Sequence, residues 1–331
     1  MKVYLASAGV RPDHSHIRQF ERLADCDRVG RHHLTDDPSD ADIALFVECH
    51  QLPDDWQLQA IRSSPVNQRY PSKVFVYDER DRPWCAFPGL YVSMPTRAFR
   101  ADWQKSAPYF LVDDPVERLP RPMTPPTPEL LFSFVGSRTH PCRNAVLALA
   151  HPRGQVRSVD GFLFHDDSSA DFHTRRTEFA EAMFRSKFVL CPRGHGTSSI
   201  RLFETLAAGR APVIISDDWC PPSGPDWDQI AVVWPERRID ELPRHLELIE
   251  SEAEHRGTLA RAAYEEWYAV DVMFDRLMSQ LEQLRAARPH RPFPPSGVRD
   301  GRYVRLAAGV AANRARGELR RVRGRAASWG R

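Results

Sequence analysis

The sequence has no apolar run of about eighteen residues, the length that a membrane-spanning helix needs. Its first apolar stretch, in MKVYLASAGVRPDHSH, is too short and too soon interrupted for a secretory signal. The six cysteines are scattered without a Cys-x-x-Cys pair, which fits free thiols in a reducing cytosol. No G-x-G-x-x-G follows the first strand, where LASAGVRPDH stands, and this disfavours an NAD-dependent dehydrogenase.

Lysine is nearly missing, with 4 lysines against 42 arginines, and the arginines gather near the C-terminus. Residues 285–331 hold 13 arginines against Asp300 and Glu318, although the net charge of the whole chain is only +2. For the basic tail, residues 289–331, two interpretations stay open: a basic amphipathic helix on an anionic membrane surface, or a disordered extension. Nucleic acid is a disfavoured partner because no recognised nucleic-acid-binding fold accompanies the tail.

The first third of the chain predicts an α/β domain, which we place at residues 1–112. Apolar runs separated by amphipathic segments indicate a parallel sheet covered by helices on both faces. The expected strands are residues 2–6, 42–48, 73–78, 89–93 and 108–112, and the expected helices are residues 15–24 and 54–62.

A proline-rich segment then interrupts the pattern. Residues 113–128 contain six prolines, which neither a helix nor a central strand accommodates, so we expect an extended linker at 113–129. A long surface loop within one domain is the alternative. A second α/β domain is expected at residues 130–288. Its predicted strands are residues 130–136, 155–159, 187–191, 211–216 and 231–234, and its predicted helices are residues 142–150, 174–185, 200–209, 239–255 and 258–286.

The most informative stretch is residues 186–236. A buried strand, KFVLC, leads into the turn PRGHGTSS, then a helix, the strand APVIIS and the acidic turn DDW. Strand, glycine-rich turn, helix and strand in this order form a βαβ unit, whose turn lies where a parallel sheet presents its ligands. The helix start is a ready anion site, and its first turn carries Arg201 and Glu204 on the face opposite its apolar stripe. A solvated ion pair on an exposed helix face is the plainer interpretation of those two residues.

At these residues the chain resembles the exostosin-type glycosyltransferases, glycosyltransferase family forty-seven. The likeness lies in SKFVLCPRG, in R-x-x-E-x-x-A-x-G, in the strand that follows, and in the S-D-x-x-x-P-P turn. The resemblance implies a GT-B-like α/β fold, with two Rossmann-like domains facing across a cleft. It makes residues 130–288 the nucleotide-sugar-binding domain and residues 1–112 the acceptor-side domain. It also implies that the last helices cross back to the first domain.

The donor would be held by two loops and one helix. The segment FVGSR ends a predicted strand and offers a close backbone approach and a cation to the diphosphate, while the glycine-rich turn faces it. Glu204 matches the family's glutamate, which accepts hydrogen bonds from the ribose hydroxyls. The expected donor-binding residues are Gly136, Ser137, Arg138, Arg193, Gly194, His195, Ser198, Ser199, Arg201 and Glu204.

Inversion at the sugar carbon needs a general base near the acceptor oxygen. Asp217 and Asp218 end a strand at the carboxyl edge of the sheet, and His14 follows the first strand of the other domain. We keep these three as candidates, with one of the aspartates alternatively capping the turn. The letters Asp226-Trp227-Asp228 resemble a metal motif, but we interpret them as loop residues around a packing tryptophan and expect neither a metal nor a cofactor.

We therefore predict a metal-independent, inverting glycosyltransferase that moves a hexose or related sugar from a nucleotide-sugar donor to a glycan or glycolipid acceptor. The missing anchor and the arginine bias suggest a bacterial, cytoplasmic protein of polysaccharide biosynthesis, peripheral on the inner membrane face if the tail binds lipid. Two alternatives stay open: a catalytically inactive GT-B-like protein that binds nucleotide or glycan, and a membrane-surface adaptor that acts through the basic tail.

Overall fold

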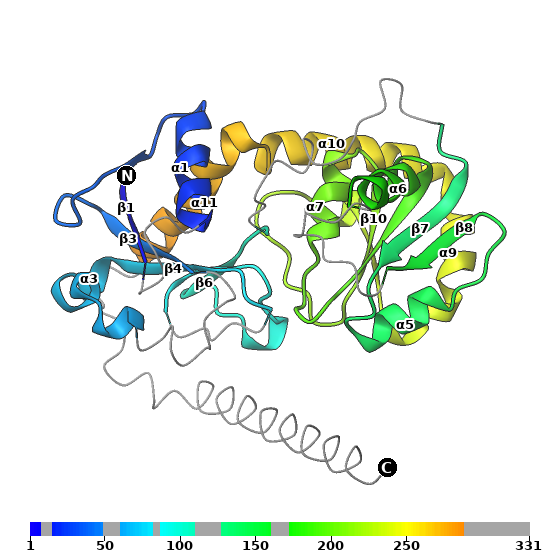
Figure 1. The fold of residues 1–331 in the computed structure, drawn as a ribbon, viewed down its shortest axis with the longest axis horizontal. Helices are drawn as coiled ribbons and strands as arrows, with labels where there is room; N and C mark the ends of the chain where they lie inside the picture. The colour runs from blue at the N-terminus through cyan, green and yellow to red at the C-terminus, as the bar shows by residue number, and fades with distance from the viewer. Residues whose placement is uncertain (8–14, 49–59, 82–86, 110–126, 160–171, 288–331) are drawn as a thin grey trace, which may run out of the picture.

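Two parallel sheets with flanking helices form two lobes that lie side by side (Figure 1). The computed structural model describes residues 1–7, 15–48, 60–81, 87–109, 127–159 and 172–287. We call the first sheet and the helices packed on it the N-lobe, and the second sheet and its helices the C-lobe. This is the α/β, GT-B-like architecture of two Rossmann-like units that the sequence predicts.

The N-lobe sheet has six parallel strands in the order β2-β1-β3-β4-β5-β6. Every residue of β4 is buried, as expected for a parallel strand covered on both faces. Its strands are β1 (Lys2–Ala6), β2 (His33–Leu34), β3 (Ile43–Glu48), β4 (Val74–Asp78), β5 (Gly89–Tyr91) and β6 (Gln104–Ser106).

The C-lobe sheet has five parallel strands in the order β11-β10-β9-β7-β8. Its strands are β7 (Leu130–Gly136), β8 (Gly154–Ser158), β9 (Ser186–Pro192), β10 (Ala211–Ile215) and β11 (Val232–Trp234). In the sheet, β7, which comes first along the chain, therefore lies between β8 and β9. The chain adds β8 on one side of β7 and β9 on the other, and such a switch point is where open α/β sheets bind their ligands.

Helices cover both faces of each sheet, and two apolar clusters fill each lobe. The α-helices are α1 (Ser15–Cys26), α3 (Pro65–Arg69), α5 (Pro141–Leu147), α6 (Phe172–Phe184), α7 (Ile200–Ala207), α8 (Trp227–Ile230), α9 (Leu242–Leu248), α10 (Ala253–Trp267) and α11 (Val270–Ala287). Short 3-10 turns span Pro71–Lys73, Thr96–Ala98, Glu236–Glu241 and Glu250–Glu252.

The last helix leaves the C-lobe. Figure 1 shows α10 lying along the C-lobe and α11 continuing from it to lie beside α1. An apolar stripe of α11 with helical spacing, which includes Phe274, Leu277 and Leu281, is buried in the same cluster as Phe20 of α1. Asp275 of α11 is buried as well, and Arg31 of the N-lobe donates to it at 2.6 Å. The C-terminal helix therefore belongs to the N-lobe core, as the family resemblance implies.

Several predicted elements differ from those observed. The sequence missed β2, which is two residues long, and β6, whose sequence QKS is polar. Pro108 and Tyr109, at the start of the strand predicted at 108–112, are not in a strand. In place of the two helices predicted at 239–255 and 258–286, the structure has α9, α10 and α11. The predicted second helix is interrupted at Tyr268 and Ala269, between α10 and α11.

Other predictions lie outside the described residues. These are most of the linker at 113–129, most of the helix at 54–62, His14, and the basic tail at 289–331. Among the helices that the structure describes, none is long and apolar enough to span a membrane.

Candidate functional site

Two of the predicted donor loops meet at the switch point of the C-lobe sheet. Strand β7 ends at Gly136 and β9 ends at Pro192, and these strands are neighbours in the sheet. Parallel strands end at the same edge, so the segments 137–140 and 193–199 leave that edge together. The predicted contacts Ser137, Arg138, Arg193, Gly194, His195, Ser198 and Ser199 lie on these segments, and Gly136 ends β7.

Arg143 of α5 joins the two loops. Its guanidinium donates to the carbonyl oxygens of Arg193 at 2.8 Å, Ser137 at 3.2 Å and Pro192 at 3.2 Å. Burial, with the charge of Arg201 nearby, lowers the pKa of Arg143 to about 10, so the group is still charged at neutral pH. The sequence analysis did not single out Arg143, because an arginine on a short helix looks like a surface residue.

Arg201 is buried beneath the first loop and is not on an exposed helix face. Its side chain is 6% exposed, and its Nη2 donates to the carbonyl oxygen of Val135. The guanidinium lies 4.7 Å from the ring centroid of Phe134 and 5.2 Å from that of Phe179. Burial lowers its pKa, an effect that the neighbouring Glu204 opposes. The solvated-face interpretation is therefore wrong for Arg201, and its contact with a diphosphate stays a prediction.

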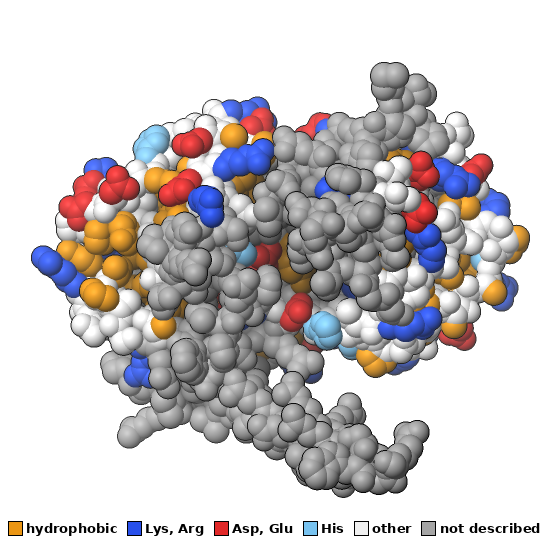
Figure 2. Space-filling model, in the orientation of Figure 1, with side chains coloured by type: hydrophobic (Ala, Val, Ile, Leu, Met, Phe, Trp, Pro, Cys, Tyr) orange, Lys and Arg blue, Asp and Glu red, His pale blue; other side chains and the backbone are white. Residues whose placement is uncertain are grey.

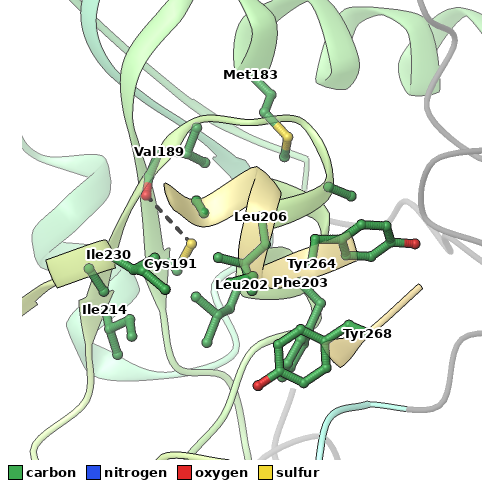
Figure 3. Close-up of a cluster of buried hydrophobic side chains, with 14 of the residues drawn as sticks. Met183, Val189, Cys191, Leu202, Phe203, Leu206, Ile214, Ile230, Tyr264 and Tyr268 are labelled. Carbon is green, nitrogen blue, oxygen red and sulfur yellow. Dashed lines mark hydrogen bonds between the residues drawn. The ribbon is translucent and has the colours of Figure 1, made fainter. Parts of the chain in front are cut away.

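Helix α7 carries the two predicted residues on a buried element. Figure 3 shows Leu202, Phe203 and Leu206 of this helix among Tyr264, Tyr268 and other core side chains. Thr205 is fully buried too, whereas Glu204 is half-buried. Packing on nearly all sides gives the start of α7 a rigid support, which a site on a strand-to-helix turn needs.

Four buried polar atoms near the two loops have no hydrogen-bond partner among the described residues. They are Thr139 Oγ1, Arg193 Nε, Ser198 Oγ and Arg201 Nε. A buried donor without a partner costs about 1–3 kcal/mol, so atoms of this kind call for a water molecule or a ligand. Three of these atoms lie on the segments 137–140 and 193–199, and the fourth lies at the start of α7. Polar groups at this edge of the sheet therefore lack hydrogen-bond partners among the described residues.

The glycine-rich turn also contacts the N-lobe. The amide of Gly196 donates to Asp81 Oδ1 at 3.1 Å, and Thr197 Oγ1 donates to the carbonyl oxygen of Met94 at 3.2 Å. A Cβ atom on Gly196 would lie 2.3 Å from Ser93 Oγ, so only glycine fits there. Figure 2 shows acidic and histidine side chains next to one another where the lobes meet. The glycine-rich turn of the C-lobe therefore lies against the N-lobe.

The two aspartates predicted as base candidates hold the acidic turn. Asp217 Oδ1 accepts from the amide of Glu236 at 2.9 Å, and the Asp217 amide donates back to Glu236 at 3.1 Å. Asp218 Oδ1 accepts from Thr96 Oγ1 of the N-lobe at 2.7 Å, and its carboxylate lies 3.4 Å from Arg97. Each carboxylate thus has a structural partner, while the catalytic assignment of both stays a prediction.

One group of side chains among the described residues has metal-ligand chemistry. One ligand atom each from His140, Cys142 and Glu236 lies within 4.8 Å of the others. Burial raises the pKa of the Cys142 thiol to about 12, and burial together with Arg193 lowers the pKa of His140. Arg193 also lies 3.9 Å from Glu236, so a cation already neutralises this carboxylate. The group therefore offers metal-ligand atoms with an arginine beside them, and the expectation that no metal is needed stays a prediction.

The chain matches one protein-family model and several curated proteins. Residues 67–249 match the model described as the exostosin GT47 domain. Exostosin-1 homolog of Caenorhabditis elegans is 41% identical over 73 residues, which cover 22% of this chain and 19% of that protein. Exostosin-1a of Danio rerio is 28% identical over 175 residues, covering 46% of this chain and 23% of that protein. The chain therefore spans less than a quarter of the length of these relatives.

Among solved structures, Acinetobacter baumannii MurG aligns with 86% of this chain at 11% identity and a TM-score of 0.33.

Proposed function

This chain belongs to the exostosin GT47 family, and we propose that it is an inverting glycosyltransferase that moves a sugar from a nucleotide-sugar donor to a glycan or glycolipid acceptor. The proposal includes a metal-independent reaction. The activity rests on the family match over residues 67–249 and on the chemistry of the site between the lobes.

The observation that supports the donor site most strongly is the group of unpartnered buried atoms at the switch point. Thr139, Arg193, Ser198 and Arg201 each contribute one polar atom without a partner among the described residues. Phosphate and sugar oxygens are acceptors, and a diphosphate brings several of them to one place. Two arginines and the start of α7 favour an anion there. A nucleoside diphosphate matches both the charge and the hydrogen-bond demand.

Glu204 is the residue that we assign to the ribose. Its side chain is half-buried one turn into α7, behind the two loops. A carboxylate in this position accepts hydrogen bonds from adjacent ribose hydroxyls, as the acidic residue of dinucleotide sites does. Arg201 lies one turn earlier on the same helix, and the charge of Glu204 opposes the lowering of the Arg201 pKa by burial.

A thermal-shift screen against UDP, GDP, CMP and their sugars tests the proposal. We expect stabilisation by one nucleotide series, followed by release of that nucleotide from its sugar during turnover. Glu204→Ala should weaken binding of the selected nucleotide by about 10-fold or more, the effect of losing a charged hydrogen bond. The matched control is Glu178→Ala, which removes a carboxylate of the same lobe that is paired with Arg157 on the surface. The proposal fails if the wild-type protein neither binds nor turns over any member of the panel.

A further inference from the structure

Asp81 is an N-lobe carboxylate that reaches the glycine-rich turn of the C-lobe. It follows β4 by three residues, so the carboxyl edge of the N-lobe sheet places it between the lobes. Its Oδ1 accepts from the amide of Gly196 at 3.1 Å, and its Oδ2 lies 3.9 Å from Nδ1 of His195. The contact between Asp81 and Gly196 joins residues 115 positions apart in the chain.

The groups around Asp81 come from both lobes. Ser93 Oγ and Tyr109 Oη of the N-lobe are hydrogen-bonded at 3.1 Å, and a Cβ atom on Gly196 would collide with Ser93. Burial and the charge of Asp81 raise the pKa of Tyr109, which keeps that hydroxyl neutral. Asp81 and Tyr109 both favour the charged form of Arg143, the residue that joins the donor loops. Asp81 is therefore within electrostatic range of the proposed diphosphate site.

Accessibility separates Asp81 from two other carboxylates at the end of β4, Asp78, which ends the strand, and Glu79, which follows it. The side chain of Asp78 is 2% exposed and is paired with Arg80, and that of Glu79 is 9% exposed and lies 2.5 Å from His16. The side chain of Asp81 is 51% exposed. A carboxylate with this exposure can be reached by an acceptor hydroxyl and can return the proton to solvent.

We propose that Asp81 is the general base of the sugar transfer, an inference that rests on the proposed function. With the diphosphate at the C-lobe loops, the acceptor approaches from the N-lobe side, so an inverting reaction needs its base there. Asp81 takes the proton of the acceptor hydroxyl as the acceptor oxygen forms its bond to the anomeric carbon. The bond from that carbon to the diphosphate oxygen breaks, and its electron pair leaves with the nucleoside diphosphate. Protonated Asp81 then returns its proton to water.

The contact with Gly196 also allows a purely structural role. Asp81 would then only hold the lobes together, as Asp218 does through Thr96. Alternatively, its carboxylate would compete with the donor phosphate for the Gly196 amide. These roles differ in what Asp81→Asn does, because asparagine keeps an oxygen for the Gly196 amide but cannot accept a proton at neutral pH.

The experiment measures hydrolysis of the nucleotide sugar that the UDP, GDP and CMP panel selects, with water in place of the acceptor. Asp81→Asn should lower kcat by about 10²–10⁴-fold with KM and the nucleotide thermal shift unchanged. The kcat of the wild-type protein should fall at acid pH, because a protonated base cannot accept a proton, and the kcat of Asp81→Asn should not show this fall. Ser106→Ala is the matched control, since it removes a 2.7 Å hydrogen bond to the Cys220 carbonyl oxygen between the lobes but away from the turn. It should lower stability and leave kcat within about twofold.

Three outcomes overturn the inference while the proposed function stands. One is a wild-type kcat in Asp81→Asn, which would leave the carboxylate without a chemical role. Another is equal losses of stability and rate in Asp81→Asn and Ser106→Ala, which would make Asp81 a contact between lobes. The third is tighter nucleotide binding in Asp81→Asn with kcat retained, which would make the carboxylate a competitor of phosphate. Failure of the wild-type protein to bind or hydrolyse any panel member would instead overturn the proposed function, and this inference with it.

Discussion

Arg143 donates a 2.8 Å hydrogen bond from Nε to the carbonyl oxygen of Arg193, and this bond connects α5 to the glycine-rich turn. The same guanidinium reaches Ser137 on the other donor loop. One planar cation with several fixed donors thus sets the distance between two loops that end neighbouring strands. The spacing of the proposed diphosphate site therefore depends on Arg143, whose three guanidinium nitrogens each donate to a main-chain carbonyl oxygen.

Replacing Arg143 should separate the loops. In Arg143→Lys the charge remains, but one ammonium cannot span three carbonyl oxygens, and each buried carbonyl left without a donor costs about 1–3 kcal/mol. We expect the Kd for the selected nucleoside diphosphate, measured by calorimetry, to rise at least 10-fold. The control is Arg157→Lys, an exposed arginine paired with Glu178 in the same lobe. Unchanged nucleotide binding in Arg143→Lys would show that the loops keep their spacing without the guanidinium.

The contact between α7 and α10 should not tolerate a side chain at Gly257. A Cβ atom there would lie 2.6 Å from the carbonyl oxygen of Gly209, which is backbone and has no rotamer to change. Gly257→Ala should therefore lower the free energy of unfolding by about 2–3 kcal/mol, the upper part of the range for overpacking of a tight contact. Urea denaturation measures the change.

Gly30→Ala is the matched control for Gly257→Ala. Gly30 has a φ of +68°, and a Cβ atom there would meet nothing within 4 Å. Only the strain of a left-handed residue remains, which costs about 1 kcal/mol. If both variants lose the same stability, the close approach of the two helices does not matter.

Glu250 should make the stability of the C-lobe depend on acid pH. It accepts hydrogen bonds from Arg153 at 2.5 Å and from Lys187 at 2.6 Å, and these lower its pKa from 4.5 to about 2. A carboxyl whose pKa is lower in the folded state stabilises the fold above its unfolded pKa. This contribution is lost as pH falls from about 4.5 towards about 2.

Glu250→Gln tests this dependence. At pH 7 the variant should be less stable than the wild-type protein by about 1 kcal/mol, since the site is open to solvent and screening weakens the pair. In urea denaturation at several pH values, the gap should narrow steadily below about pH 4.5. A difference in stability between the two proteins that stays constant down to pH 3 would mean that it does not come from the charge of the Glu250 carboxylate.

The elements that the sequence predicted well are the buried parallel strands. KFVLC and LLFSFVG are apolar almost throughout, a pattern that few other elements share, and they form β9 and β7. Strand β6 was missed because its residues Gln104 and Ser106 are polar yet buried, so no apolar signal marks them. The break between α10 and α11 was missed because the apolar spacing continues across it and neither glycine nor proline marks the site.

Asp81 shows how much of the site the sequence could have indicated. It lies near the carboxyl end of a predicted strand, a position that alone could have made it a candidate, but Asp78 and Glu79 share that position. Only the structure shows that these two are buried and paired while Asp81 is half-exposed. Arg143 carried no comparable signal, because its acceptors are main-chain carbonyls of loops far along the chain.

The sequence by itself determined the family and the two loops at the switch point, because strand, turn and helix signals are local and the exostosin motif is continuous. The tertiary structure decided what each polar side chain does. Arg201 became a buried support, Asp218 a contact between lobes, and Asp81 the carboxylate opposite the glycine-rich turn. These roles depend on which residues of the N-lobe meet which residues of the C-lobe. That pairing arises from the contact between two separate sheets and from α11 crossing between them, which no local pattern in the chain encodes.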